Sequence, residues 1–426
     1  MQIISYLCAK IMQLPADFIT QMERMMAPEL WHVLRKGLAQ EPSVSIRINP
    51  SKIDLKEWEV VLSDGVVPWC EYGFYLTHRL PFTFDPLLHA GAYYVQESSS
   101  MFLHHVLREI LRDARCEVRG ARNDLLVLDL CAAPGGKSTL VRSVLPAESL
   151  LVSNEPIRGR YQVLQENVMK WGYDRHEVTN LYPRDFRKRK ELYDIILTDV
   201  PCSGEGMFRK DEGSIAEWSL QKVEQCQRLQ REIVSDAWEC LAPGGLLIYS
   251  TCTFNTLENE ENIKWILENF DAEVLPVHTK AEWNIQGSIL PDFIAPIYRF
   301  IPGLTRGEGL FMAVLRKGGK ASPHPSLFTL PPIPDRWSPT RSLSLFTLHS
   351  SLFTQEIDYP TALRYLRREA IVLPSDAPLG IVTVSYQGIP LGQCKNIGSR
   401  ANNLYPKEWR IKSTHTPDYE AILRHT

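Results

Sequence analysis

Short apolar runs alternate with stretches of helical periodicity across residues 121–318. Runs of this kind are typical of buried parallel strands that are joined by crossover helices. The pattern predicts strands at 125–130, 150–153, 193–198, 246–250 and 310–315, and helices that include 158–171 and 220–240. This alternation indicates an α/β fold, in which a Rossmann-like domain is built on an open, mostly parallel sheet.

The segment before this domain has a different pattern. Apolar side chains recur at helical spacing from 22 to 38, which predicts a small helical lead-in packed in a core. Alternating apolar and polar residues at 45–49 and at 69–76 predict strands. Residues 1–120 are therefore expected to form an N-terminal α+β region.

The segment after the domain has two parts. Residues 319–355 are rich in Pro and Ser and contain the phrase Ser-Leu-Phe-Thr-Leu twice, which predicts a linker. Alternation at 379–386, followed by turn-forming residues at 387–388 and 390–392, predicts strands. Residues 356–426 are therefore expected to form a small β-rich C-terminal domain.

The overall composition narrows the class of protein. The 426 residues carry 47 Lys and Arg against 50 Asp and Glu, a formal net charge of -3, so total charge does not indicate nucleic-acid binding. Nine Cys without a paired C-x-x-C motif predict free thiols in a reducing compartment and no metal site. Neither a signal peptide nor an apolar run of about 18 residues is evident. We therefore expect a cytoplasmic protein that does not contact a membrane.

A turn of small residues follows the first strand of the α/β domain, where a helix begins. Small side chains let a backbone approach a ligand closely, and the free N–H groups at a helix start can hold its polar atoms. The turn therefore predicts a nucleotide-type ligand. Its residues are Cys131, Ala132, Ala133, Pro134, Gly135, Gly136 and Lys137.

Two ligand classes fit this turn. The triplet at 136–138 is also typical of the phosphate-binding loop G-x-x-x-x-G-K-[ST] of nucleotide hydrolases, in which Asp199 would be the magnesium-binding partner. That loop needs Gly where this chain has Cys131. S-adenosylmethionine is favoured by Glu155, which ends the next predicted strand, because a carboxylate there can accept hydrogen bonds from ribose hydroxyls. Asp185 is a candidate for binding the adenine amino group.

Two cysteines follow predicted strands of the same sheet. Cys202 comes three residues after Asp199, and Cys252 comes shortly after the strand at 246–250. The carboxyl ends of parallel strands form the edge of an open sheet where ligands bind. A thiolate at that edge can add to C6 of a cytosine and so turn C5 into an enamine carbon that accepts a methyl group. Asp199 is a candidate for hydrogen bonding to the ring nitrogen as charge builds there.

In these motifs the chain resembles the Sun-type RNA 5-methylcytosine methyltransferases, and it is most similar to the bacterial enzymes that modify 16S ribosomal RNA. The stretch at 94–101 also carries the resemblance. The resemblance implies methyl transfer from S-adenosylmethionine to C5 of a cytosine in 16S ribosomal RNA or the small ribosomal subunit. No obligate protein partner is inferred. Transfer RNA is the alternative substrate. A non-catalytic RNA-binding protein, a further alternative, would need neither thiol.

The resemblance also implies roles for single residues. Cys252 would be the nucleophile and Cys202 would assist product release, a choice that spacing alone does not decide. Asp199 and Lys137 would belong to the same catalytic group. The residues implied to contact S-adenosylmethionine are Cys131, Ala132, Ala133, Pro134, Gly135, Gly136, Lys137, Glu155, Arg160, Asp185 and Asp199.

Three regions are candidates for RNA contact. Residues 402–411 are similar to the C-terminal region of the ribosomal RNA branch, which implies a PUA-like RNA-binding domain at 356–426. Aromatic and basic residues are interleaved there, as base stacking and backbone contact require. The N-terminal region at 1–120 is expected to recruit RNA as well. A basic patch is formed by Arg184, Arg187, Lys188, Arg189 and Lys190.

Overall fold

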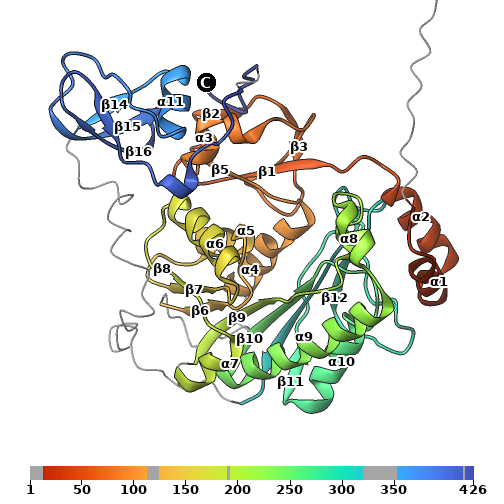
Figure 1. Cartoon of the computed structure of the whole chain (residues 1–426). Coiled ribbons are helices and arrows are strands. Elements are labelled where there is room, and N and C mark those ends of the chain that lie inside the picture. The colour runs from red at the N-terminus through yellow and green to blue at the C-terminus, as the bar shows by residue number, and fades with distance from the viewer. Residues whose placement is uncertain (1–12, 113–123, 190–191, 320–352, 416–417) are drawn as a thin grey trace, which may run out of the picture. The chain divides into compact units, whose positions relative to one another are not determined.

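The computed structural model of the chain describes residues 13–112, 124–189, 192–319, 353–415 and 418–426 (Figure 1). These residues form two compact units. The first unit draws on Met1–Ser43, Glu97–Cys131 and Tyr182–Pro325, and the second on Val44–Gln96, Ala132–Leu181 and Ser326–Thr426. Most of the predicted linker at 319–355 lies outside the described residues. No helix within the described ranges has both the length and the apolar composition needed to cross a membrane.

A sheet forms the centre of the first unit. Its strands are β6 (Leu126–Asp129), β9 (Tyr193–Asp199), β10 (Leu241–Thr251), β11 (Ala272–Val274), β12 (Ile297–Phe300) and β13 (Leu310–Lys317). They run in the order β11, β13, β10, β9, β6, and β12 also pairs with β13. Strands β6, β9 and β10 are parallel, whereas β13 is antiparallel to β10. The strands predicted at 125–130, 193–198, 246–250 and 310–315 are thereby confirmed.

The first unit also contains helices. They are α1 (Ala16–Met25), α2 (Pro28–Leu38), α4 (Phe102–Arg112), α7 (Pro183–Phe186), α8 (Glu212–Glu217), α9 (Leu220–Cys240) and α10 (Glu260–Asn269), with short 3-10 turns η2 (Ser99–Met101), η3 (Arg187–Arg189), η4 (Glu205–Met207) and η5 (Ala281–Trp283). The long helix α9 lies along β9 and β10 (Figure 1). It begins where predicted, because the Ser219 hydroxyl caps it by accepting a hydrogen bond from the Lys222 N–H at 3.1 Å.

The helical lead-in consists of two helices. The break falls at Pro28, which fits the first position of a helix but cannot continue one. Phe18 of α1 and Leu34 of α2 are buried in one cluster with Phe208 and Trp218. The apolar spacing therefore reflects core packing, as predicted.

The second unit holds the remaining strands and helices. The strands are β1 (Val44–Ile48), β2 (Trp58–Val60), β3 (Ser63–Val66), β4 (Gly73–Leu76), β5 (Tyr93–Val95), β7 (Leu150–Asn154), β8 (His176–Thr179), β14 (Thr354–Glu356), β15 (Gly380–Tyr386), β16 (Ile389–Asn396), β17 (Ala401–Asn403) and β18 (Leu423–His425). The helices are α3 (Pro86–His89), α5 (Gly136–Val144), α6 (Arg158–Trp171) and α11 (Tyr359–Leu366), with 3-10 turns η1 (Phe82–Phe84) and η8 (Lys407–Trp409). Two four-stranded sheets form, β3-β4-β1-β5 and β14-β15-β16-β17, and β7 runs parallel to β8.

Two predicted elements of the second unit are wrong in part. Of the strand predicted at 69–76 only β4 forms, because the chain makes tight turns with hydrogen bonds between residues three apart before it. The turn predicted at 390–392 lies inside β16. Gln387 and Gly388, with φ of 51° and 76°, make the hairpin turn by themselves.

The C-terminal strands share one hydrophobic core with the N-terminal strands of the second unit. Ile46 and Ile48 of β1 belong to the same buried cluster as Ile357, Tyr365 and Leu423. The last strand, β18, pairs with β2. Residues 356–426 are therefore packed into this core and do not form a module that can be removed without exposing it.

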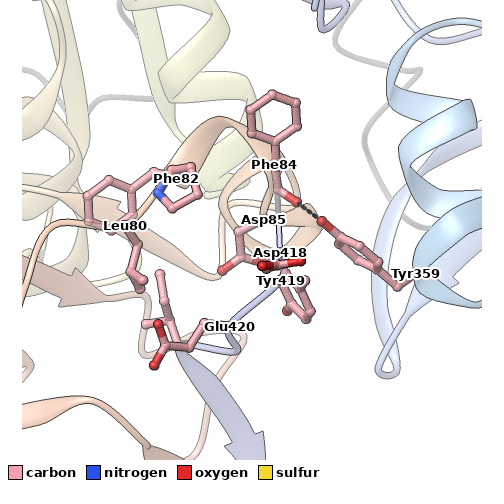
Figure 2. A pocket seen from close by; sticks show the side chains of 10 residues that line it. Leu80, Phe82, Phe84, Asp85, Tyr359, Asp418, Tyr419 and Glu420 are labelled. Carbon is pink, nitrogen blue, oxygen red and sulfur yellow. Dashed lines mark hydrogen bonds between the residues drawn. The ribbon is translucent and has the colours of Figure 1, made fainter. Parts of the chain in front are cut away.

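A small pocket lies next to the C-terminal residues of the second unit (Figure 2). The rings of Tyr359 and Tyr419 are stacked there with their centroids 4.1 Å apart, and the Tyr359 hydroxyl donates to the carbonyl of Phe84 at 3.2 Å. The pocket has a volume of about 10 Å³, room for about one water molecule. It is therefore too small to hold a nucleotide.

Candidate active site

Two thiols meet at the carboxyl edge of the sheet in the first unit. Cys202 follows β9 by three residues, and Cys252 follows β10 directly. Their Sγ atoms are 3.1 Å apart, which lets one thiol donate a hydrogen bond to the other sulfur. This hydrogen bond and burial raise the pKa of Cys202. The two thiols can therefore share one hydrogen bond, in which either sulfur can be the donor.

Asp199 lies at the same edge. It is the last residue of β9 and stands opposite Ser250 in the parallel pairing with β10. The Ser250 hydroxyl donates to Asp199 Oδ1 at 2.7 Å. The carboxyl group is therefore held in a fixed orientation on the edge that also carries the two thiols.

Two further carboxylates, which the sequence did not single out, support the thiol loops. Glu205 and Glu258 are fully buried, and the side-chain amide of Asn255 donates to both at 2.9 Å. Burial, together with the charge of Glu205, raises the pKa of Glu258 to about 7. Each acid stands within six residues of a cysteine, which is the one signal in the sequence, but spacing does not reveal that they are buried.

The predicted cofactor loop is compact. Within the second unit it runs from residue 132 into the first turn of α5, and Cys131 ends the adjoining segment of the first unit. Gly135 has a φ of 111°, a conformation that side chains rarely adopt. A Cβ added to Gly136 would lie 3.3 Å from the ring of Tyr94. Ala132 and Ala133 are buried, so the side chains at these two positions are packed inside the protein.

Glu155 and Arg160 are tied to this loop. One terminal nitrogen of Arg160 donates to the carbonyl of Ala133 at 3.0 Å, and the other lies 3.5 Å from Glu155 Oε2. Glu155 Oε1 accepts a hydrogen bond from the Ile157 N–H at 2.9 Å. A carboxylate oriented in this way beside a loop of small residues fits a cofactor that carries a ribose.

Asp185 and the predicted basic patch are engaged in ion pairs. Lys188 contacts Asp185 at 2.8 Å, and this hydrogen bond lowers the pKa of Asp185. Arg187 contacts Asp236 and Glu239 of α9 at 3.1 and 2.6 Å. Carboxylates therefore neutralise part of the patch, which weakens it as an RNA contact. Outside the described part of the chain lie Lys190 and the side chain of Arg189.

The C-terminal stretch at 402–411 is only partly exposed. Tyr405 is 1% exposed, and its ring packs edge-on against Tyr365 with the centroids 5.5 Å apart. A ring buried in this core cannot stack on a base, so for Tyr405 the predicted role is wrong. Lys407 and Arg410 are exposed and stay candidates for RNA contact.

Arg47 of β1 supports the cofactor loop, and the sequence did not single it out. Its guanidinium is 1% exposed and donates to the Thr139 hydroxyl at 2.7 Å and to the carbonyl of Gly136 at 3.2 Å. It also lies 4.4 Å from the ring centroid of Trp171. The one signal in the sequence is a charged residue between two isoleucines of a predicted strand.

Three family models match the chain in succession. The model described as the N-terminal domain of 16S rRNA methyltransferase RsmF matches residues 14–98. The model for 16S rRNA methyltransferase RsmB/F matches residues 118–316, and the model for the methyltransferase RsmF PUA domain matches residues 353–411.

Curated relatives extend the match over nearly the whole chain. A protein named ribosomal RNA small subunit methyltransferase F from Escherichia coli is 29% identical over 92% of this chain and 96% of its own length. The protein of the same name from Cronobacter sakazakii is 28% identical over 85% of this chain and 89% of its own. The protein of this name from Pectobacterium carotovorum is 32% identical over 73% of this chain and 64% of its own length.

Solved structures share the fold. A methyltransferase homolog protein from Pyrococcus horikoshii has a TM-score of 0.57 at 24% identity, over 71% of this chain and 100% of that one. NSun6 from the same organism, solved with SFG, has a TM-score of 0.59 at 19% identity, over 72% of this chain and 99% of that one. The fold is therefore α/β, a Rossmann-like methyltransferase domain with an N-terminal domain and a C-terminal PUA domain.

The comparisons support a methyltransferase, and they give no support to a nucleotide hydrolase. The three models lie in the order expected from the Sun-type resemblance, and the match to the relative from Escherichia coli spans 96% of that protein's length. The chain therefore belongs to the RsmB/F family of methyltransferases, and it is an RNA cytosine-5 methyltransferase that uses S-adenosylmethionine.

Proposed function

We propose that the chain methylates C5 of a cytosine in 16S ribosomal RNA in the cytoplasm, through a covalent bond between that cytosine and Cys252. The names of the relatives support the ribosomal substrate. The observation that carries the covalent step is the thiol pair, because Cys202 and Cys252 hold their sulfur atoms 3.1 Å apart after two neighbouring parallel strands.

In this mechanism the Cys252 thiolate adds to C6 of the cytosine, and Asp199 hydrogen-bonds the ring nitrogen as its charge grows. S-adenosylmethionine supplies an electrophilic methyl group, which C5 accepts. The C5 proton then leaves to a base, the C5–C6 double bond reforms, and the electron pair of the C6–S bond returns to Cys252. Cys202 is assigned to this release step, because it can hold a proton 3.1 Å from the sulfur that departs.

The cofactor contacts follow the resemblance. Glu155 is assigned to the ribose hydroxyls, with Arg160 at the rim, and its carboxylate is already held in place by the Ile157 N–H. Asp185 is assigned to the adenine, although it would have to share its carboxylate with Lys188. The remaining assigned contacts are Cys131, Ala132, Ala133, Pro134, Gly135, Gly136, Lys137 and Asp199.

Replacing Glu155 with Ala tests the cofactor site. The variant removes a buried carboxylate, and a charge-assisted hydrogen bond is worth about 1.5–3 kcal/mol, so we expect adenosylhomocysteine affinity to fall at least about tenfold. Isothermal titration calorimetry measures this without RNA. Glu148→Ala, at an exposed ion pair, is the matched control and should bind normally. Equal affinities in the two variants would show that Glu155 does not hold the ribose.

We assign RNA contact in the C-terminal domain at 356–426 to its exposed cations. Deleting the domain would expose the core that it shares with β1, so a double variant, Lys407→Ser with Arg410→Ser, is the cleaner test. Loss of two phosphate contacts should weaken binding to unmodified 16S ribosomal RNA and reduce the slope of log affinity against log salt by about 2. Arg228→Ser with Lys264→Ser, both exposed elsewhere, should leave the slope unchanged. An unchanged slope in the first variant would rule this surface out.

A further inference from the structure

Glu205 reaches from one thiol loop to the other. It lies three residues after Cys202, and its Oε2 accepts three hydrogen bonds from the loop that follows Cys252. The donors are the Thr253 hydroxyl at 2.9 Å and the backbone N–H groups of Phe254 at 2.6 Å and Asn255 at 3.0 Å. The loop behind Cys252 is therefore held by an acid from the loop behind Cys202.

Glu258 contacts the loop of Cys202 from the loop of Cys252. It follows Cys252 by six residues, and its Oε2 accepts a hydrogen bond at 3.0 Å from the N–H of Ser203, the residue after Cys202. The same oxygen accepts from Gln230 Nε2 at 2.6 Å. Asn255 joins the two acids, since its side-chain amide lies 2.9 Å from Oε1 of each. Each carboxylate thus holds the loop of the opposite thiol.

The hydrogen bonds around Glu205 require a carboxylate. Every group that faces Glu205 is a donor, including the indole N–H of Trp218 at 3.1 Å, and a carboxylate is a side chain that only accepts. A glutamine of the same shape would turn an NH₂ group toward these donors. Burying a charge is costly unless it is fully hydrogen-bonded, so the buried Glu205 favours the loop geometry that keeps all of its donors in place.

We propose that Glu205 and Glu258 are positioning residues that set the distance between the two thiols, which the release of the covalent adduct requires. The inference deepens the proposed function and rests on its covalent mechanism. Gly206 adds to the same contact, because its N–H donates to the carbonyl of Cys252 at 2.6 Å and a Cβ there would lie 2.4 Å from that oxygen. The two loops therefore touch directly beside the sulfur atoms.

The distance between the thiols can be measured without RNA or cofactor. Diamide oxidises two neighbouring thiols to a disulfide, each sulfur losing its proton while diamide is reduced to the hydrazine. In the unmodified protein we expect a Cys202–Cys252 disulfide to form readily, as followed by mass spectrometry of non-reduced peptides. In Glu205→Gln we expect closure at least about tenfold slower, while Glu212→Gln, an exposed acid on α8, should match the unmodified protein.

A milder pair of variants covers the case in which Glu205→Gln does not fold. Thr253→Val removes one donor to Glu205, and Thr253→Ser restores the hydroxyl, so closure should slow in the first and recover in the second. In methylation assays, Glu205→Gln should lower kcat and lengthen the life of the adduct without changing KM for S-adenosylmethionine. Equal closure rates in Glu205→Gln and Glu212→Gln, or in Thr253→Val and Thr253→Ser, would overturn the proposal. Absence of an adduct in every variant would instead sink the proposed covalent function, because the diamide comparison does not depend on it.

Discussion

The Cys202→Ala variant is expected to accumulate a covalent protein–RNA adduct, seen as a band of lower mobility on a denaturing gel that RNase removes. The reason is that Cys252 still adds to the cytosine, while the group 3.1 Å from its sulfur that serves release is gone. Cys252→Ala should give no such band and no methylation. The proteins are to be expressed in a host that offers ribosomal RNA.

Cys226→Ala is the matched control for this experiment. Cys226 is a free, half-buried thiol on α9 and has no proposed role, so this variant should methylate RNA without a persistent band. A band in Cys252→Ala alone would exchange the roles of the two thiols. No band in either variant would contradict the covalent mechanism.

Replacing Arg299 with Met should give the largest loss of stability. Both Arg299 and its partner Glu260 are completely buried, and one terminal nitrogen of Arg299 contacts the two carboxylate oxygens of Glu260 at 2.6 and 2.7 Å. The other donates to the carbonyl of Phe254 at 2.6 Å. Met leaves the charge of Glu260 buried without its cation, so the free energy of unfolding should fall by about 3–5 kcal/mol.

Urea unfolding followed by tryptophan fluorescence measures this change. Arg316→Met is the control, because Arg316 also pairs with a glutamate of the first unit, Glu273, but at the protein surface. An exposed pair is worth about 0–1 kcal/mol, so this variant should unfold almost as the unmodified protein does. Similar losses in the free energy of unfolding of the two variants would mean that the buried Arg299 pair stabilises the protein no more than the exposed pair does.

The thiol pair was predictable because it depends on strands. Once β9 and β10 are recognised as parallel neighbours, the residues after their carboxyl ends must come to one edge, and this brings Cys202 and Cys252 together. The same reasoning held for Glu155 after β7, which the structure ties through Arg160 to the loop of Ala133. What was predicted correctly follows from the order and direction of elements.

The supporting residues were not predictable in this way. Glu205 resembles any surface acid in the sequence, and its burial depends on donors 48 to 50 residues later in the chain. Arg47 is buried because Thr139, 92 residues away, accepts its hydrogen bond. Tyr405 shows the opposite error. An aromatic residue among cations predicts an RNA contact, but the ring of Tyr405 is buried in a core. Side-chain partners far apart in the chain leave no periodic signal.

The core that β1 shares with the C-terminal strands also fixes an order of events during synthesis. Ile46 and Ile48 leave the ribosome about 310 residues before Ile357, the first C-terminal member of their cluster. At about 5–20 residues per second, that interval is roughly 15–60 s. During it the apolar face of β1 lacks part of its cover, so we expect that face to stay exposed in the nascent chain until the C-terminal strands emerge.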